Sequence, residues 1–279
     1  MTDTARPEQL ARYAFFADLR PDALARLAAH VTTAKLRARS CVWKAGDPVR
    51  ELLLVRSGVL REAIDGAGDR DLCLRFLGRG DLAGDGDVLG ALATDLEHRT
   101  RLTVHEEASV WRAPLTALRE LVAADPRVTT RLGSVVVAAR REVEQRLAAQ
   151  VFQPVEARIA AVLGRLAGRF GVRDSRGIIV NLKLTHRDLA ALAGSSRESA
   201  SVVLTAWRRE GLVAAEGRRV VVLDLDALSA LSGSPVESGG ARVTPLSGTR
   251  RSSADIVGPP GRAEQGRRRR RPPPLYSRA

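Results

Sequence analysis

The stretch LTHRDLAALAGSSRESASVVLTAWRR, residues 184–209, predicts two short helices joined by a sharp turn. Thr185 and Asp188 form a capping-box pattern, because each side chain can bind a free backbone N–H of the first helical turn. An apolar stripe at helical spacing follows this start. Gly194 supplies the turn, since it can take a positive φ at no steric cost. The stretch therefore predicts a helix-turn-helix unit.

The second of these helices has an apolar face and a polar N-terminal end. Its inward positions are Ala200, Val203, Leu204 and Trp207. Either Ser195 or Ser196 can cap it. Its polar end carries Ser196, Arg197, Glu198, Ser199 and Ser201. A helix-turn-helix that binds DNA needs this layout, with hydrogen-bonding side chains on the helix that enters the major groove.

The segment that follows predicts a wing. Residues 212–215 and 218–223 have the character of two short strands about a glycine turn. A winged helix has this order of elements, and Arg218 and Arg219 fall near the wing tip, where a DNA phosphate would lie. The alternative is an ordinary helical hairpin in a globular core. The wing favours DNA binding over that alternative.

The composition agrees with a protein that binds nucleic acid. The 279 residues have room for two modest domains, and the net charge of +13 favours a polyanionic partner without identifying it. Residues 232–279 are rich in Gly, Pro, Ser and Arg without a periodic apolar set, so this tail is predicted to be disordered. The arginine run 267–271 would add nonspecific phosphate attraction, or else belongs to a solvated low-complexity tail.

Several classes of protein are disfavoured. No apolar run approaches the roughly 20 residues of a membrane span, and the start of the chain has no secretory signal pattern, so we expect a cytoplasmic protein. Neither GxSxG nor a Walker loop occurs, the four histidines are scattered, and no Cys/His cluster could hold a metal. We therefore expect no enzyme, no catalytic residues and no metal site. Cys41 and Cys73 are interpreted as buried small hydrophobes in strands, with a regulatory disulfide as the minor alternative.

The chain divides into regions of different periodicity. We expect a flexible segment over 1–12, a β-rich effector domain over 13–124, a long helix over 125–150, a winged helix-turn-helix domain over 151–231 and the tail over 232–279. In the effector domain, helical residues 13–31 precede short apolar runs separated by turn signals. The expected strands are 51–55, 59–64, 71–77, 100–104 and 108–112. This spacing predicts a β-sandwich or barrel rather than a parallel α/β sheet.

The long helix is predicted to begin at Asp125-Pro126, with Asp125 at the N-cap and Pro126 in the first turn. Its apolar stripe consists of Val128, Leu132, Val135, Ala139, Val143, Leu147 and Gln150, widened by Val136 and Val151. A helix of about 25 residues spans roughly 37 Å, more than one small domain needs. We favour a parallel coiled-coil-like dimer contact along this stripe; the alternative is a helix packed only on its own sheet.

A β-roll, a long helix and a winged helix in this order resemble the Crp/Fnr family of bacterial transcription regulators. The resemblance covers roughly residues 15–231, and its most specific parts are 44–47, 53–58 and 185–211. It implies an α+β fold: an N-terminal cyclic-nucleotide-binding-like β-roll (a jelly roll), a dimerisation helix and a C-terminal winged helix-turn-helix domain.

The resemblance also implies which side chains contact DNA bases. In such regulators the arginine and glutamate after the turn contact base edges in the major groove. Here Arg197 would donate two hydrogen bonds to guanine O6 and N7, and Glu198 would accept one from cytosine N4. Ser196 and Ser199 would add weaker polar contacts.

Phosphate contacts are implied at the start of the first helix. Thr185, His186 and Arg187 resemble the corner that contacts phosphates in this family. Val202 is a departure, because it stands where the best-known members usually carry a second arginine. The familiar TGTGA-like and TTGAT-like half-sites of the family are therefore not carried over to this chain.

For the roll, the resemblance implies a cyclic nucleotide, cAMP or cGMP, as the ligand. The family holds it on a Gly-Glu pair that opens a short helix and on a following Arg-Ser/Thr-Ala. By alignment Gly84 would be the backbone donor, Asp85 the carboxylate for the ribose, Arg99 the clamp on the phosphate and Thr100 its hydroxyl partner.

This cassette departs from the family pattern. Asp85 is one methylene shorter than the usual glutamate, and Arg101 replaces a small residue. Gly86 and Asp87 weaken the short helix. The alternative is a roll that keeps the fold with a lapsed or altered pocket.

Taken together, we expect a homodimer whose recognition helices enter successive major grooves of a pseudo-palindromic site in double-stranded DNA, about one helical turn apart. RNA polymerase is the further expected partner. A ligand in the roll would act on the dimer helices and on a hinge at 150–155. The alternatives are a DNA-binding protein that is ligand-independent or a nonspecific, nucleoid-type one whose roll only dimerises, and a regulatory module attached to an enzyme, which lacks a catalytic constellation here.

Overall fold

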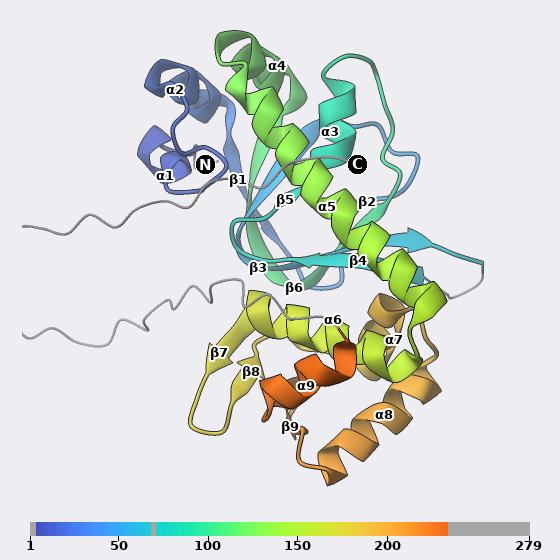
Figure 1. The fold of residues 1–279 in the computed structure, drawn as a ribbon. Helices are drawn as coiled ribbons and strands as arrows, with labels where there is room; N and C mark the ends of the chain where they lie inside the picture. Colours follow the sequence, from blue (N-terminus) through green and yellow to red (C-terminus); the bar gives the residue numbers. More distant parts are fainter. Residues whose placement is uncertain (1–3, 68–70, 234–279) are drawn as a thin grey trace, which may run out of the picture. The chain divides into compact units, whose positions relative to one another are not determined.

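The computed structural model describes residues 4–67 and 71–233, which form a β-roll, a long helix and a winged helix-turn-helix domain (Figure 1). The predicted α+β fold class is confirmed in these residues. From residue 234 onward the predicted disordered tail, with its arginine run, lies outside the described residues.

The β-roll is built on a six-stranded antiparallel sheet in the order β1-β6-β3-β4, with β2 paired to β6 and β5 paired to β3. Its strands are β1 (Thr32–Leu36), β2 (Cys41–Trp43), β3 (Glu51–Asp65), β4 (Asp71–Leu77), β5 (Leu82–Ala83) and β6 (Arg101–Pro114). Apolar side chains from these strands, including Trp43, Leu60 and Val110, form one continuous buried cluster. The roll is therefore a packed core and not an open barrel.

Strands β3 and β6 are each longer than predicted. We expected two short strands in each region, with a turn at 56–58 in the first. Instead β3 continues through Gly58, and its pairing with β6 shifts register around this residue. Gly58 has a φ of +78°, and a Cβ there would overlap the backbone of Glu107. The glycine thus permits a bulge that bends one long strand where the sequence predicts a turn.

The N-terminal region also differs from expectation. Helix α1 (Pro7–Ala11) lies in the segment expected to be flexible, and its Leu10 is completely buried. The helical segment expected over 13–31 is helical only in α2 (Pro21–His30). Proline disfavours helical backbone in the preceding residue, so the helix starts at Pro21. The backbone N–H of Arg20 instead donates to the Asp125 carboxylate at 3.0 Å.

Helices α3 (Asp85–Ala91) and α4 (Leu115–Ala124) complete the roll, and the long α5 (Arg127–Phe152) follows it. The predicted start of this helix is confirmed: Asp125 has an extended backbone and its carboxylate accepts from the Arg127 backbone N–H at 3.2 Å, and Pro126 already has helical backbone angles. The start of α5 packs on the roll through the fully buried Val128 and Leu132. From Val137 onward α5 leaves apolar side chains exposed, and these are Val137, Val143, Leu147, Val151 and Phe152. The predicted stripe thus divides into a buried part and an open part.

The C-terminal domain packs helices on a four-stranded antiparallel sheet of order β7-β8-β10-β9. Its elements are α6 (Val155–Phe170), β7 (Gly171–Arg173), β8 (Ile178–Val180), α7 (His186–Ala193), α8 (Arg197–Arg209), β9 (Val213–Glu216), β10 (Arg219–Val222) and α9 (Leu225–Ser232). Trp207 of α8 is fully buried and donates to Glu156 of α6 at 2.9 Å. The two helices and the wing predicted from the sequence are confirmed.

The two cysteines differ, although both were expected to be buried. Cys73 on β4 is buried, and burial raises the pKa of its thiol to about 12. Cys41 on β2 is exposed, because this short strand turns alternate residues outward. Both thiols are free.

Candidate nucleic-acid interface and roll pocket

The start of α7 is held by the predicted capping box. The Thr185 hydroxyl accepts from the Asp188 backbone N–H at 3.1 Å, and the Asp188 carboxylate accepts from the Thr185 backbone N–H at 2.9 Å. Because these groups satisfy the helix terminus, the neighbouring side chains of His186 and Arg187 are not needed for capping. Thr185 and Arg187 are exposed, and His186 is half-buried.

Helix α8 presents the predicted polar end to solvent. Ser196 is its N-cap and accepts from the Ser199 backbone N–H at 3.1 Å. Arg197 and Glu198 are exposed in the first turn, and Val202 one turn later is 70% exposed. These side chains project from a helix that is anchored on its opposite face by Trp207.

Local contacts set the charges of Glu198 and His186 at this end of the domain. A hydrogen bond from its own backbone N–H, together with the Ser196 hydroxyl, lowers the pKa of Glu198 below its ordinary value. His186 contacts Ser201 of α8 at 2.7 Å through Nδ1. Burial and then the positive charges of Arg208 and Arg197 lower the pKa of His186. An approaching phosphate would oppose these effects.

The wing is tied to the start of α7. The backbone N–H of Leu184 donates to the carbonyl of Arg218 at 2.8 Å. Arg218 is exposed at the wing turn, and Arg219 is half-buried with its Nε lacking a hydrogen-bond partner in the described part of the chain. The structure thus brings the predicted wing arginines near the predicted phosphate corner, although they lie more than 30 residues away in sequence.

The carboxyl end of α7 is held by side chains of α5 and α6, and one of them, Gln150, was expected in the dimer stripe instead. Arg146 of α5 donates to the carbonyl of Leu192 at 2.8 Å, and Gln150 donates to that of Ala193 at 2.9 Å. Gly194 has a φ of +58°, and a Cβ there would overlap Gln150. Arg158 of α6 also binds the Ala193 carbonyl, at 2.9 Å. The turn therefore needs glycine for its left-handed conformation, and a side chain there would also displace the Gln150 amide.

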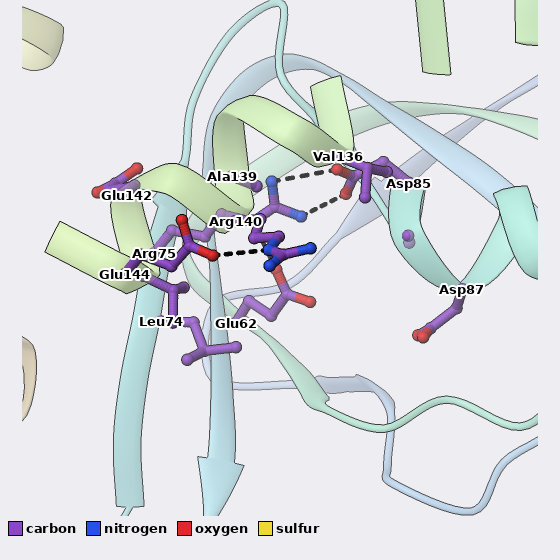
Figure 2. A pocket seen from close by; sticks show the side chains of 13 residues that line it. Glu62, Leu74, Arg75, Asp85, Asp87, Val136, Ala139, Arg140, Glu142 and Glu144 are labelled. Atoms are coloured by element: carbon purple, nitrogen blue, oxygen red, sulfur yellow. Dashed lines mark hydrogen bonds and ion pairs between the residues drawn. The ribbon is translucent and has the colours of Figure 1, made fainter. Parts of the chain in front are cut away.

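A cavity of about 380 Å³ lies between the roll and α5 (Figure 2). Helix α5 lines it with Val136, Ala139, Arg140, Glu142, Val143 and Glu144. The roll lines it with Glu62, Leu74, Arg75, Gly84, Asp85, Gly86 and Asp87. Figure 2 shows Arg75 reaching from β4 toward Asp85 at the start of α3. The lining thus carries five carboxylates against two guanidinium groups.

Arg75 is the central group of this cavity. Its guanidinium binds Asp85 through both terminal nitrogens and Glu62 through Nε, the latter at 2.6 Å. Thr100 donates to the other oxygen of Glu62 at 2.8 Å. Burial by itself would lower the pKa of Arg75, but the Glu62 and Asp85 carboxylates raise it above its ordinary value. These groups satisfy one another inside the roll.

Of the four residues expected to hold a ligand, only two lie in the wall of the cavity. Gly84 and Asp85 line the cavity, with Asp85 only 2% exposed. Thr100 touches it indirectly through Glu62. Arg99 is exposed and does not belong to the lining. The expected phosphate clamp and the expected ribose carboxylate are therefore not brought together around one cavity.

Comparison with known proteins finds two family profiles in the chain. A cyclic nucleotide-binding domain matches residues 33–125, and a Crp-like helix-turn-helix domain matches residues 157–231. Among the described residues, no helix is both long enough and apolar enough to cross a membrane. The curated proteins that the chain resembles include transcriptional regulators.

Similar proteins cover most of the chain. A CRP-like cAMP-activated global transcriptional regulator of Mycobacterium tuberculosis is 27% identical over 222 residues, which are 80% of this chain and 97% of that protein. A transcriptional activator, Anr, of Pseudomonas aeruginosa is 26% identical over 72% of this chain and 81% of its own. The crystal structure of a CRP family regulator from Thermus thermophilus is 29% identical, with a TM-score of 0.61, over 74% of this chain and 99% of that one.

Proposed function

We propose that this chain, which belongs to the Crp/Fnr family of transcription regulators, acts as a homodimer that places one α8 in each half of a pseudo-palindromic DNA site. The observation that carries the proposal is the α7–α8 unit, whose polar end is exposed and whose opposite face is buried. Two such units, about one helical turn of DNA apart, would bind successive major grooves.

The exposed part of α5 supports dimerisation. Leu147 and Val151 are 65% and 69% exposed, and they lie at coiled-coil spacing on one helix face. Phe152 at the end of α5 is 82% exposed. Side chains of this size gain most when a second copy of α5 covers them. We therefore assign the homodimer contact to this half of α5.

We assign the recognition of DNA bases to the first two turns of α8. Arg197 would donate two hydrogen bonds to guanine, and Glu198 would accept from cytosine N4. Ser196 and Ser199 are capping partners of each other, so they contribute only weaker polar contacts. Val202 offers no hydrogen bond and can contact only the methyl group of a thymine.

Phosphates would be bound on either side of this helix. Thr185, His186 and Arg187 form one contact at the start of α7, and Arg218 and Arg219 form another on the wing. The hydrogen bond between Leu184 and Arg218 supports a single continuous surface. A dimer bound in this way would act on transcription through RNA polymerase, in the cytoplasm where bacterial DNA lies.

The roll does not fit a cyclic nucleotide as arranged here, although the matched domain and the cAMP-activated relative suggest one. A cyclic phosphate is an anion, and the cavity lining carries more carboxylates than guanidinium groups. Asp85 is bound to Arg75, and Arg99 is outside the lining. This observation favours a second candidate function, in which the regulator binds DNA without a cyclic nucleotide.

Competition binding across salt concentrations tests the proposal against nonspecific, nucleoid-type binding. A labelled site obtained by selection competes with random DNA of the same length. We expect a specificity ratio of about a thousand or more at physiological salt. A ratio near one would show that the chain only coats DNA.

A further inference from the structure

One wall of the roll pocket contains an arginine that binds two carboxylates of the same wall. Arg75 spans the distance between Glu62 on β3 and Asp85 at the start of α3 (Figure 2). Glu62 and Asp85 both line the cavity, so a ligand bound there would contact the same two elements, β3 and α3. Glu62 and Asp85 are 7% and 2% exposed, so their charges need an internal partner.

We propose that the ion pairs of Arg75 with Glu62 and Asp85, in the wall of the roll pocket, take the place of a small-molecule effector and make DNA binding by this chain independent of cyclic nucleotides. The inference rests on the proposed DNA-binding function. It goes beyond that function, because it assigns the role of the effector to a residue of the chain.

The neighbouring backbone shows how the position of Arg75 is coupled to the DNA-binding domain. Arg146 of α5 donates to the carbonyls of Cys73 and Leu74 on β4 at 2.8 and 2.6 Å, next to Arg75. The same guanidinium donates to the carbonyl of Leu192 at the end of α7. One strand is therefore held from inside the roll by Arg75 and from outside by Arg146.

This arrangement gives a contact path of three links between four elements, α3, β4, α5 and α7. Arg75 fixes β4 relative to α3, Arg146 fixes α5 relative to β4, and Arg146 and Gln150 fix the end of α7. In an effector-dependent regulator the first of these links would form only with ligand bound. Here the side chain that makes this link, Arg75, belongs to the protein itself. The α7–α8 unit is therefore held in one position without a ligand.

The test measures affinity for the selected DNA site by fluorescence anisotropy at fixed salt. The wild-type dimer is titrated without nucleotide, with millimolar cAMP and with millimolar cGMP. Arg75→Ala is titrated alone, with methylguanidinium and with methylammonium at the same concentration. Arg79→Ala, which removes an exposed arginine in the turn after β4, is the matched control. Thermal unfolding is recorded for every sample.

We expect each nucleotide to change wild-type affinity by less than about twofold. Arg75→Ala should bind about tenfold more weakly or worse, and methylguanidinium but not methylammonium should restore its affinity and its Tm. Arg79→Ala should behave as wild type.

Activation of the wild type by about tenfold or more with either nucleotide would overturn the inference. So would a folded Arg75→Ala dimer with wild-type affinity. If the wild type itself binds no sequence specifically, the proposed function has failed instead. The Tm of Arg75→Ala with methylguanidinium would then still decide whether a guanidinium occupies the pocket.

Discussion

The DNA-binding end of α8 and the roll pocket use the same kinds of side chain in opposite ways. In α8, Arg197 and Glu198 are exposed while the helix terminus is satisfied by Ser196. In the pocket, Arg75 and Asp85 are withdrawn from water and bound to each other. The first arrangement leaves charged groups available to an external partner, and in the second the charged groups are paired with each other inside the molecule.

This difference shows why a motif alone does not identify a ligand site. Exposed charges contribute little to folding, so those at the end of α8 stay available to an external partner. Buried charges must be paired, and removing one partner leaves the other uncompensated. The contact partners of a side chain therefore say more about its role than its position in a family pattern.

The largest expected difference between the two regions is in how a substitution changes the stability of the protein. Asp85→Ala leaves Arg75 with a single buried carboxylate, and we expect it to lower the free energy of unfolding by about 3 kcal/mol. Glu198→Ala, the matched change at the DNA-binding end, should leave stability unchanged because the side chain is exposed. Urea denaturation of both variants measures the contrast. Equal stability of the two variants would show that Asp85 is not an essential partner in the roll.

The next effect is on DNA affinity. Arg197→Ala should weaken specific binding by about 10- to 100-fold, corresponding to roughly 1–3 kcal/mol, and should relax the preference at one base pair. Arg218→Ala is the comparison variant, because loss of a phosphate contact should weaken specific and random DNA equally. Anisotropy titrations with both DNAs measure the difference. If Arg197→Ala lowers only nonspecific affinity, Arg197 does not contact a base.

The smallest effect concerns pH at His186. Burial and nearby arginines lower the pKa of His186 in the folded protein from its ordinary value of 6.5. The unfolded chain therefore takes up the proton first, and the stability from neutral His186, present above pH 6.5, is lost as the pH falls through the lowered pKa. DNA affinity should change in the opposite direction, because a phosphate favours the protonated ring.

His186→Gln should reduce both pH dependences, which unfolding and anisotropy measurements from about pH 8 to 5 can follow. A DNA affinity that depends on pH in the same way in wild type and His186→Gln would exclude the phosphate contact at this residue.

The DNA-binding end was predictable because its signals are local. Thr185 and Asp188 are three residues apart, and Gly194 and Ser196 mark the turn and the next cap within the same stretch. Such contacts follow from helix geometry alone. The second half of α5 was predictable for a related reason, since its spacing indicates an exposed stripe before any partner is known.

The pocket was not predictable, because its centre depends on strand register. Asp65 pairs with Asp71 and Ala63 with Cys73, but Glu62 pairs with Arg75 since Leu74 is an extra residue on β4. A bulge of this kind changes which side chains meet, and nothing in the spacing of the sequence reveals it. An opposite-charge pair across the 62–75 hairpin was the one available signal.

The most direct test of ligand-independent, sequence-specific DNA binding is selection of bound sites from a random DNA library by the wild-type dimer. The selection is run without nucleotide, with cAMP and with cGMP. We predict the same two-fold symmetric motif in all three pools, with half-site centres about 10 base pairs apart. Enrichment of a motif only in a nucleotide-containing pool would contradict the role of Arg75, and enrichment of no motif in any pool would contradict specific DNA recognition by α8.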